Sequence, residues 1–198
     1  MRFAMLLAFL ACGCATGSST GAPSGGPEPA DARERGWRSP APEAADGGTA
    51  SAAPSVATAT LEPKSGSKVT GTARVTPSAS GVAVLVTVQD ASPGEHGVHI
   101  HEKGDCSDPA AMSAGPHFTP NSGAHHGGPN TSVRHGGDLG NIKVSSLGGG
   151  LLVVAVSDLS VENVTGRSIV VHEKQDDLMT DPAGNSGARI ACGVLHGE

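Results

Sequence analysis

The chain has 198 residues, of which 37% are hydrophobic and 2% aromatic, and this composition favours one folded domain plus an appendage. The formal net charge is −6. An acidic balance of this kind lacks the basic surface that nucleic-acid binding requires, so we expect no nucleic-acid partner.

Residues 1–14 have the character of a secretion signal. A short basic start, Met1 and Arg2, precedes the apolar run of residues 3–11. That run is too short to span a bilayer, which needs about 20 residues. Cys12 and Cys14 follow among small residues, as in a bacterial lipoprotein signal, where the cysteine becomes the lipidated first residue. We interpret both cysteines as candidate lipidation sites, with an ordinary signal peptide and incidental cysteines as the alternative.

Residues 15–54 consist mainly of Gly, Ser, Thr, Ala and Pro and show no hydrophobic period. A segment of this composition cannot bury enough apolar surface to offset its chain entropy. We therefore expect a flexible linker that lets a folded domain stand away from a membrane. Together with the leader, it predicts an exported protein of the periplasm or cell surface, held to the membrane by a lipid anchor.

From residue 55 onward the pattern is that of β-strands. Alternating apolar and β-branched residues between turn residues predict eight short strands, at residues 55–63, 68–77, 81–90, 97–101, 139–145, 151–157, 168–172 and 189–195. No segment keeps a helical period. The all-β pattern is typical of an antiparallel sandwich or flattened barrel. Phe118 is the only aromatic residue of this domain, so its core must consist of Val, Leu, Ile and Ala.

Seven of the nine histidines lie between His96 and Gly140. His99 and His101 are two residues apart in a predicted strand, so their side chains point to the same face. Two neutral imidazoles on one face can form half of a copper or zinc site. The alternative is the polar outer face of an ordinary strand.

A second group of histidines lies on the loop that follows. His117, His126 and His135 are spaced nine residues apart, and Asp138 comes three residues after the last. Three imidazoles and one carboxylate make a complete tetrahedral shell for zinc. A bound metal would also fix a loop that glycine and proline cannot hold rigid alone. A flexible loop that binds metal loosely is the alternative.

Six motifs together resemble the copper/zinc superoxide dismutase family. They occur in the same order, across roughly residues 55 to 197, as GVHIHE (97–102), GPHFTP (115–120), HGGP (126–129), RHGGDLGN (134–141), VVHEK (170–174) and GNSGARIACG (184–193). The resemblance implies an eight-stranded antiparallel Greek-key β-sandwich or flattened barrel with long metal-binding loops over residues 55–198. It also implies the conversion of superoxide to dioxygen and hydrogen peroxide by Cu(II)/Cu(I) cycling.

Carried over motif by motif, the resemblance gives the copper ligands as His99, His101, His117 and His172, and the zinc ligands as His117, His126, His135 and Asp138. His117 is then the bridging imidazolate, which is expected to release copper on reduction and take a proton. Asp176 becomes the carboxylate that orients His99 and His126. His125 is an alternative to its neighbour His126 as a zinc ligand. The following Gly-Gly-Pro matches the family motif with His126 as the ligand, so we expect His125 at the surface.

Cys106 and Cys192 are the only cysteines of the predicted domain. In an exported protein an isolated pair is most simply a disulfide, while two free thiols acting as extra metal ligands are the alternative. The resemblance implies the disulfide. Such a bridge would tie the metal-binding loop to the last strand.

A small anionic substrate needs positive charge at the mouth of the site. From residue 55 on, however, the chain has 9 Lys and Arg against 14 Asp and Glu, so only a local positive patch can attract superoxide. Arg189 is the best candidate, because its guanidinium can both attract and hydrogen-bond a diatomic anion. Lys174 is a second candidate. The alternative for Arg189 is a surface salt bridge.

The sequence therefore predicts a superoxide dismutase that protects the cell envelope from oxidative damage. The competing hypothesis is an envelope protein that binds and buffers copper without turnover. Such a protein would need His99, His101 and His172, but neither Arg189 nor a complete second metal shell. Whether the protein forms a homodimer stays open.

Overall fold

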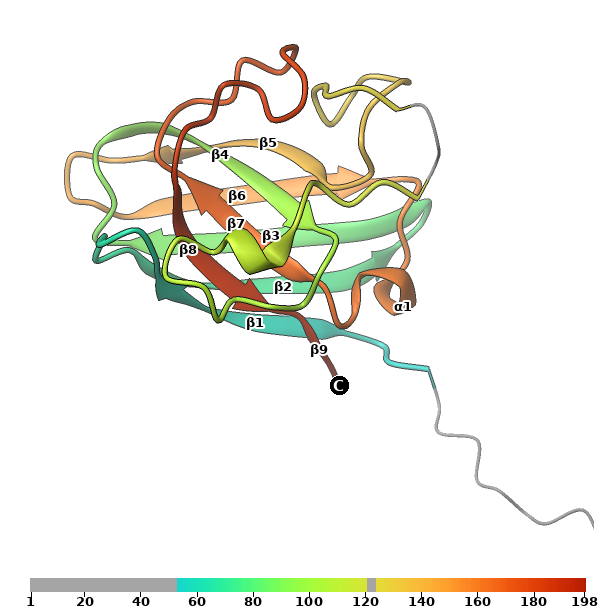
Figure 1. The fold of residues 1–198 in the computed structure, drawn as a ribbon. Coiled ribbons are helices and arrows are strands. Elements are labelled where there is room, and N and C mark those ends of the chain that lie inside the picture. Colours follow the sequence, from blue (N-terminus) through green and yellow to red (C-terminus); the bar gives the residue numbers. More distant parts are fainter. Residues whose placement is uncertain (1–52, 121–123) are drawn as a thin grey trace, which may run out of the picture. The chain divides into compact units, whose positions relative to one another are not determined.

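A computed structural model describes residues 53–120 and 124–198 (Figure 1). Within these ranges the chain forms nine strands, namely β1 (Ala57–Pro63), β2 (Thr70–Ser78), β3 (Gly81–Gln89), β4 (Gly94–His101), β5 (Asp138–Val144), β6 (Gly150–Val156), β7 (Ser168–His172), β8 (Arg189–Val194) and β9 (His196–Gly197). The predicted signal, with Cys12 and Cys14, and the predicted linker up to residue 52 lie outside the described residues. In the described ranges, no helix has the length and apolar character needed to cross a bilayer.

All eight predicted strands are confirmed, and the two-residue β9 is an addition. The alternation that predicted them is visible in β3, where Val82, Val84, Val86 and Val88 are buried between more exposed neighbours. Between residues 53 and 198, leaving out 121–123, helix is limited to a single turn of 3-10 helix, η1 (Met112–Ala114), and one turn of α-helix, α1 (Val161–Val164). The all-β prediction is therefore confirmed.

Eight of the strands close into a Greek-key barrel. The strand order is β2-β3-β6-β5-β4-β7-β8-β1, all pairs are antiparallel, and a further pairing of β1 with β2 closes the ring. Two connections skip neighbours: β3 leads to β4 past β6 and β5, and β6 leads to β7 past β5 and β4. Strand β9 pairs only with the beginning of β1. Closure leaves the barrel itself with no unpaired edge strand.

Two narrow seams explain why the barrel is flattened. β5 pairs with β6 only through Lys143–Leu151 and Val144–Gly150, and β1 pairs with β8 only through Glu62–Cys192 and Pro63–Ala191. The pairings inside each half are longer, such as the nine residue pairs of β2 with β3. The barrel thus consists of two four-stranded halves, β1-β2-β3-β6 and β5-β4-β7-β8, packed face to face.

Aliphatic side chains from both halves fill the space between them. Leu61, Ile100, Leu139, Ile142 and Leu195 are among the most deeply buried. Phe118 caps this core from the loop after β4, and the guanidinium of Arg167 lies 3.5 Å from the centre of its ring. The prediction of an aliphatic core is therefore confirmed.

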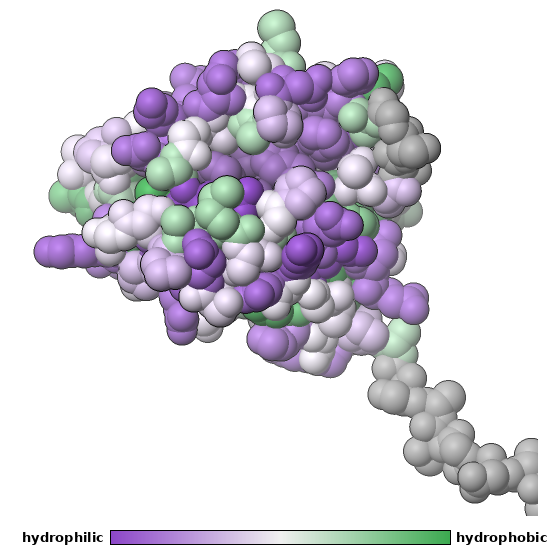
Figure 2. Space-filling view, in the orientation of Figure 1, coloured by the Kyte–Doolittle hydropathy of each residue, from purple (hydrophilic) through white to green (hydrophobic). Residues whose placement is uncertain are grey.

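Two long loops cover the outside of the β4–β7 half. They are the β4–β5 loop (residues 102–137, of which 121–123 are not described) and the β7–β8 loop (residues 173–188). In Figure 1 the first, yellow-green part of the β4–β5 loop runs in front of the strands, and its later, gold part rises above them beside the red β7–β8 loop. The surface that they present in Figure 2 is mainly hydrophilic. The described N-terminal end and the C-terminus meet away from these loops, where Ser55 donates its backbone N–H to the carbonyl of Glu198.

The expected disulfide is present between Cys106 and Cys192. It fixes the β4–β5 loop to β8, and both cysteines belong to a small buried cluster with Ala111, Ala114 and Val170 on the outer face of the barrel. The first part of the β4–β5 loop is therefore packed on its own hydrophobic base, apart from the main core.

Replacing both Cys106 and Cys192 by serine should lower the free energy of unfolding by about 4 kcal/mol, because the bridge closes a long loop in the unfolded chain. Denaturant unfolding of the wild type and the double variant measures this difference. Adding a reductant should destabilise the wild type and leave the variant unchanged. Equal stabilities with and without the bridge would contradict the assigned structural role.

Candidate metal centre

Strands β4 and β7 present three histidines on one outer face of the barrel. Val98 and Ile100 point into the core, so His99 and His101, which alternate with them, point outward. His172 at the end of the neighbouring β7 joins them, and its ring lies 4.8 Å from that of His99. All three residues are buried, because the two loops cover this face. The strands therefore provide a rigid base for a site closed to bulk water.

His117 is held on the loop by backbone contacts to β4. It forms a bridge with His101, and the following Phe118 donates its N–H to the carbonyl of Ile100. Gly137 completes this contact by donating to Phe118, and a Cβ at Gly137 would collide with the same Ile100 carbonyl. The close approach that only glycine permits thus places the imidazole of His117 directly beside β4.

Two overlapping clusters of potential ligand atoms result. The first consists of His99, His101, His117 and His172, and the second of His99, His117, His126 and Asp138, with the ligand atoms of each cluster within 4.8 Å of one another. His135 borders the second cluster: its Nδ1 lies 3.4 Å from Oδ2 of Asp138, and its ring lies 5.6 Å from that of His117. The structure thus brings together every histidine and the aspartate that the sequence assigned to metal binding.

The strongest evidence for metal is a set of histidine nitrogens that have no hydrogen-bond partner. They are His99 Nδ1, His101 Nε2, His117 Nε2, His126 Nδ1, His135 Nδ1 and His172 Nε2, all buried. Buried polar atoms without partners are costly and rare in folded proteins. Six of them converging in one place fit the lone pairs that would coordinate metal ions.

The opposite nitrogen of most of these rings is anchored. His101 Nδ1 lies 2.9 Å from the carbonyl oxygen of Gly115, and His172 Nδ1 lies 3.3 Å from that of Gly187. His117 Nδ1 lies 2.8 Å from Oδ1 of Asp138. In His101 and His172 the carbonyl acceptor orients the ring and leaves the other nitrogen for a metal, as in many metal sites. In His117 the contact instead places Nδ1 against a carboxylate of the second cluster.

Asp176 links the two clusters. Its Oδ2 lies 2.8 Å from Nε2 of His99, and its Oδ1 lies 2.7 Å from Nε2 of His126. The carboxylate is fully buried. Asn141, which the sequence reasoning missed, bonds both the N–H and the carbonyl of Asp176. Position 184 also requires glycine, because a Cβ there would overlap Asp176 and lie 2.6 Å from Nε2 of His126.

Burial and neighbouring charges set the protonation of the site. Burial, with the neighbouring His117, lowers the pKa of His99 and His101 well below the ordinary value, and burial lowers the pKa of His172 to about 3. These imidazoles are therefore neutral and can donate lone pairs. Burial alone would lower the pKa of His126 as well, but the adjacent carboxylates of Asp138, 3.1 Å from Nδ1, and Asp176, 2.7 Å from Nε2, raise it to about 10. The two carboxylates thus favour positive charge there, which a divalent metal supplies.

Arg189 lies at the edge of the histidine cluster and is partly buried. Its guanidinium donates to the carbonyls of Ala111 and Gly115, both at 2.8 Å. The Gly115 carbonyl also anchors His101, so arginine and histidine share one acceptor. In the described part of the chain no carboxylate lies within 4.0 Å of this guanidinium, so it does not form the surface salt bridge considered as an alternative.

Two further histidines lie outside the metal-binding group, and one of them, His125, is at the surface as expected. His96 is buried and contacts the backbone carbonyls of Ser92 and His172. His125 is exposed and contacts Asp181. Neither of them belongs to the two clusters.

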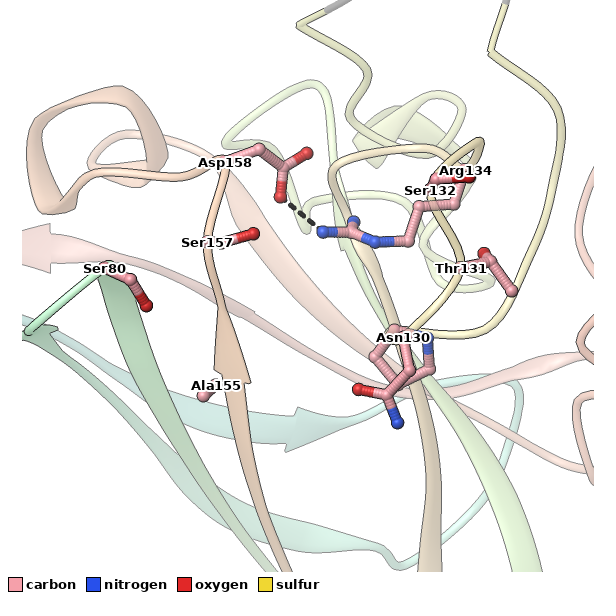
Figure 3. Close-up of a pocket in the computed structure, with 9 residues that line it drawn as sticks. Ser80, Asn130, Thr131, Ser132, Arg134, Ala155, Ser157 and Asp158 are labelled. Carbon is pink, nitrogen blue, oxygen red and sulfur yellow. Dashed lines mark hydrogen bonds and ion pairs between the residues drawn. The ribbon is translucent and has the colours of Figure 1, made fainter.

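A hollow of about 470 Å³ lies beside the second cluster but contains none of the assigned ligands. Figure 3 shows its lining of small polar side chains and the ion pair of Arg134 with Asp158. Arg134 also donates to the carbonyls of His135 and Gly136, at 2.7 and 3.1 Å. This hollow thus marks the place where a buried arginine fastens the β4–β5 loop to the segment that follows β6.

An all-β barrel with two histidine clusters that share His99 and His117 is typical of a transition-metal protein. Residues 69–195 match the family described as "Copper/zinc superoxide dismutase (SODC)". The chain belongs to the copper/zinc superoxide dismutase family, a class of oxidoreductases with copper and zinc as metals.

Individual relatives agree. The chain is 43% identical over 141 residues to the Cu-Zn superoxide dismutase of Deinococcus radiodurans, covering 65% of this chain and 78% of that protein. It is 39% identical over 118 residues to the extracellular Cu-Zn superoxide dismutase of Haemonchus contortus, covering 55% of this chain and 63% of that protein. The crystal structure of the clock protein EA4 superposes with a TM-score of 0.66 at 36% identity, covering 74% of this chain and 96% of that one.

Replacing Asp176 by asparagine should weaken the binding of both metals by about 10- to 100-fold, because the amide can accept from only one of the two rings that the carboxylate orients. Competition with a chromogenic chelator measures both affinities. Asp90→Asn is the matched control, since this exposed aspartate directly follows β3 and lies outside the two metal-covering loops. Unchanged affinities in the Asp176 variant would show that this link does not orient the ligands.

Proposed function

We propose that the first cluster holds copper, that the second holds zinc with His135 in place of His99, and that the protein disproportionates superoxide to dioxygen and hydrogen peroxide. One observation carries the assignment. Both clusters contain His99 and His117, but His99 has its Nε2 against Asp176, whereas His117 has Nδ1 against Asp138 of the second cluster and Nε2 without a partner. A single imidazole in this position can serve one metal with each nitrogen.

The donor sets distinguish the two metals. His99, His101, His117 and His172 offer four imidazole nitrogens, a set that suits tetragonal Cu(II). His117, His126, His135 and Asp138 offer three nitrogens and one carboxylate oxygen, which suit tetrahedral Zn(II).

Bound copper supplies one-electron exchange between Cu(II) and Cu(I). The residues of the chain supply position, charge and a proton. Arg189, held by two carbonyls beside His101, gives the anion a fixed partner for charge and hydrogen bonding. His117 Nε2 is placed to take up a proton and pass it to the reduced substrate. The strand histidines beside this position are themselves buried.

The competing function is copper binding without turnover. It would use His99, His101 and His172 but has no need for a partly buried arginine at their edge. Nor does it explain a complete second donor set of three imidazoles and one carboxylate. The enzyme therefore accounts for more of the observed contacts.

We further propose that the enzyme acts outside the cytoplasm, in the periplasm or at the cell surface, and that a lipid on Cys12 or Cys14 anchors it. The apolar leader and the linker composition support export. The Cys106–Cys192 disulfide supports an oxidising compartment.

The function is tested by pulse radiolysis of the copper- and zinc-loaded full chain at several ionic strengths. We expect a rate constant on the order of 10⁸–10⁹ M⁻¹s⁻¹, the ceiling that superoxide dismutases as a class approach. Arg189→Ala should lower it about tenfold and weaken its salt dependence while copper stays bound. Arg189→Lys keeps the charge but not the planar guanidinium, so its rate constant should lie between those of the wild type and Arg189→Ala.

Arg74→Ala is the matched control, because it removes the same charge from the exposed face of β2. If this variant and Arg189→Ala have the same rate and salt dependence, the role of Arg189 is refuted. Tight copper binding without superoxide consumption in the wild type would instead support the copper-buffering protein.

A further inference from the structure

The carboxylate of Asp181 joins the two metal-covering loops at a zinc-side residue. It lies in the β7–β8 loop and reaches two consecutive residues of the β4–β5 loop. Its Oδ1 accepts the backbone N–H of His126 at 2.6 Å, and its Oδ2 lies 2.8 Å from Nδ1 of His125. One carboxylate therefore contacts both the backbone of a proposed zinc ligand, His126, and the side chain of the preceding residue, His125.

The backbone around His126 is held from two directions. On one side, Oδ2 of Asp138 accepts the N–H of Gly127 at 3.0 Å. On the other side, Asp181 accepts the N–H of His126 itself. The ring of His126 is then oriented by Asp176 at Nε2. Without Asp181, the peptide that leads into His126 loses its bond to the β7–β8 loop.

The β7–β8 loop presents Asp181 in a defined turn. Asp177 accepts the N–H and hydroxyl of Thr180, and Gly184 donates its N–H to the carbonyl of Thr180 at 2.7 Å. The side chain of Leu178 also packs over Gly128 in the opposite loop. The carboxylate is therefore placed by its own loop.

The two contacts of Asp181 differ in how much they stabilise the site. The side chains of His125 and Asp181 are 73% and 51% exposed, and an exposed ion pair of this kind contributes little. The bond to His126 is a charge-assisted hydrogen bond to the backbone of a buried residue. The effect of Asp181 on the site should therefore come through His126.

We propose that Asp181 is a positioning residue for zinc, which fixes His126 as a ligand through its backbone N–H. The inference rests on the zinc site assigned under the proposed function. Because binding linkage is reciprocal, zinc should in turn hold the β7–β8 loop against the β4–β5 loop.

The test measures metal affinity and the Co(II) absorption spectrum of the zinc site in the full chain, with copper already bound. Asp181→Ala should weaken zinc binding about tenfold, leave copper affinity unchanged and alter the Co(II) ligand-field bands. Asp181→Asn keeps an oxygen acceptor for the His126 N–H and should restore most of the affinity. His125→Ala removes only the exposed contact and should behave as the wild type.

Wild-type zinc affinity and an unaltered Co(II) spectrum in Asp181→Ala would overturn the inference. So would an equal loss of zinc affinity, copper affinity and apoprotein stability, since that pattern indicates a general structural role. A wild-type chain that takes up copper but no zinc or cobalt would refute the proposed zinc site itself, which separates the two failures.

Discussion

The ring of His117 lies between the two clusters, with Nδ1 against Asp138 and Nε2 without a hydrogen-bond partner, and the arrangement of the loops follows from holding that one ring in place. The ring cannot turn without losing Asp138 on one side or the strand histidines on the other. Its backbone is fixed to β4 through the bridge to His101 and through Phe118, whose contact with Ile100 requires the glycine at position 137. The barrel supplies this fixed reference because β4 is buried on both of its faces.

Besides His117, the donors His126 and His135 lie on the β4–β5 loop, which is rich in glycine and proline and cannot be rigid by itself. The structure orders them through polar contacts that connect distant segments. Asp176 joins His99 on the strand to His126 on a loop, and the disulfide fixes the beginning of that loop to β8. Arg134 fastens its far end. Metal binding and loop order are therefore expected to depend on each other.

The sequence predicted the barrel well because strand formation leaves a local pattern. The alternation of buried valines in β3 and the two-residue spacing of His99 and His101 both follow from the period of a β-strand. The spacing of His117, His126 and His135 predicted a zinc shell by residue type alone. The addition of His172 to the copper set depended on the family resemblance, because no local period brings a residue of β7 beside β4.

Other features could not be predicted in this way. Asn141 and Asp181 act on the backbone of residues 35 and 55 positions away. A side chain that bonds a backbone group does not require any particular residue type at the position it bonds. The residue types alone therefore do not show that Asn141 bonds Asp176 or that Asp181 bonds His126. For the same reason, the sequence could not predict that His101 and Arg189 share the carbonyl of Gly115 as a hydrogen-bond acceptor.

The most direct test of a shared His117 is the magnetic coupling between metals placed in both sites. Copper(II) should be loaded into the zinc site as well as its own, and the electron paramagnetic resonance of the frozen protein recorded. If one imidazolate joins the two ions, their spins couple through it, and the low-temperature signal falls far below that of two isolated Cu(II) ions. Two independent copper spectra at full intensity would contradict the account, because the clusters would then be separate sites.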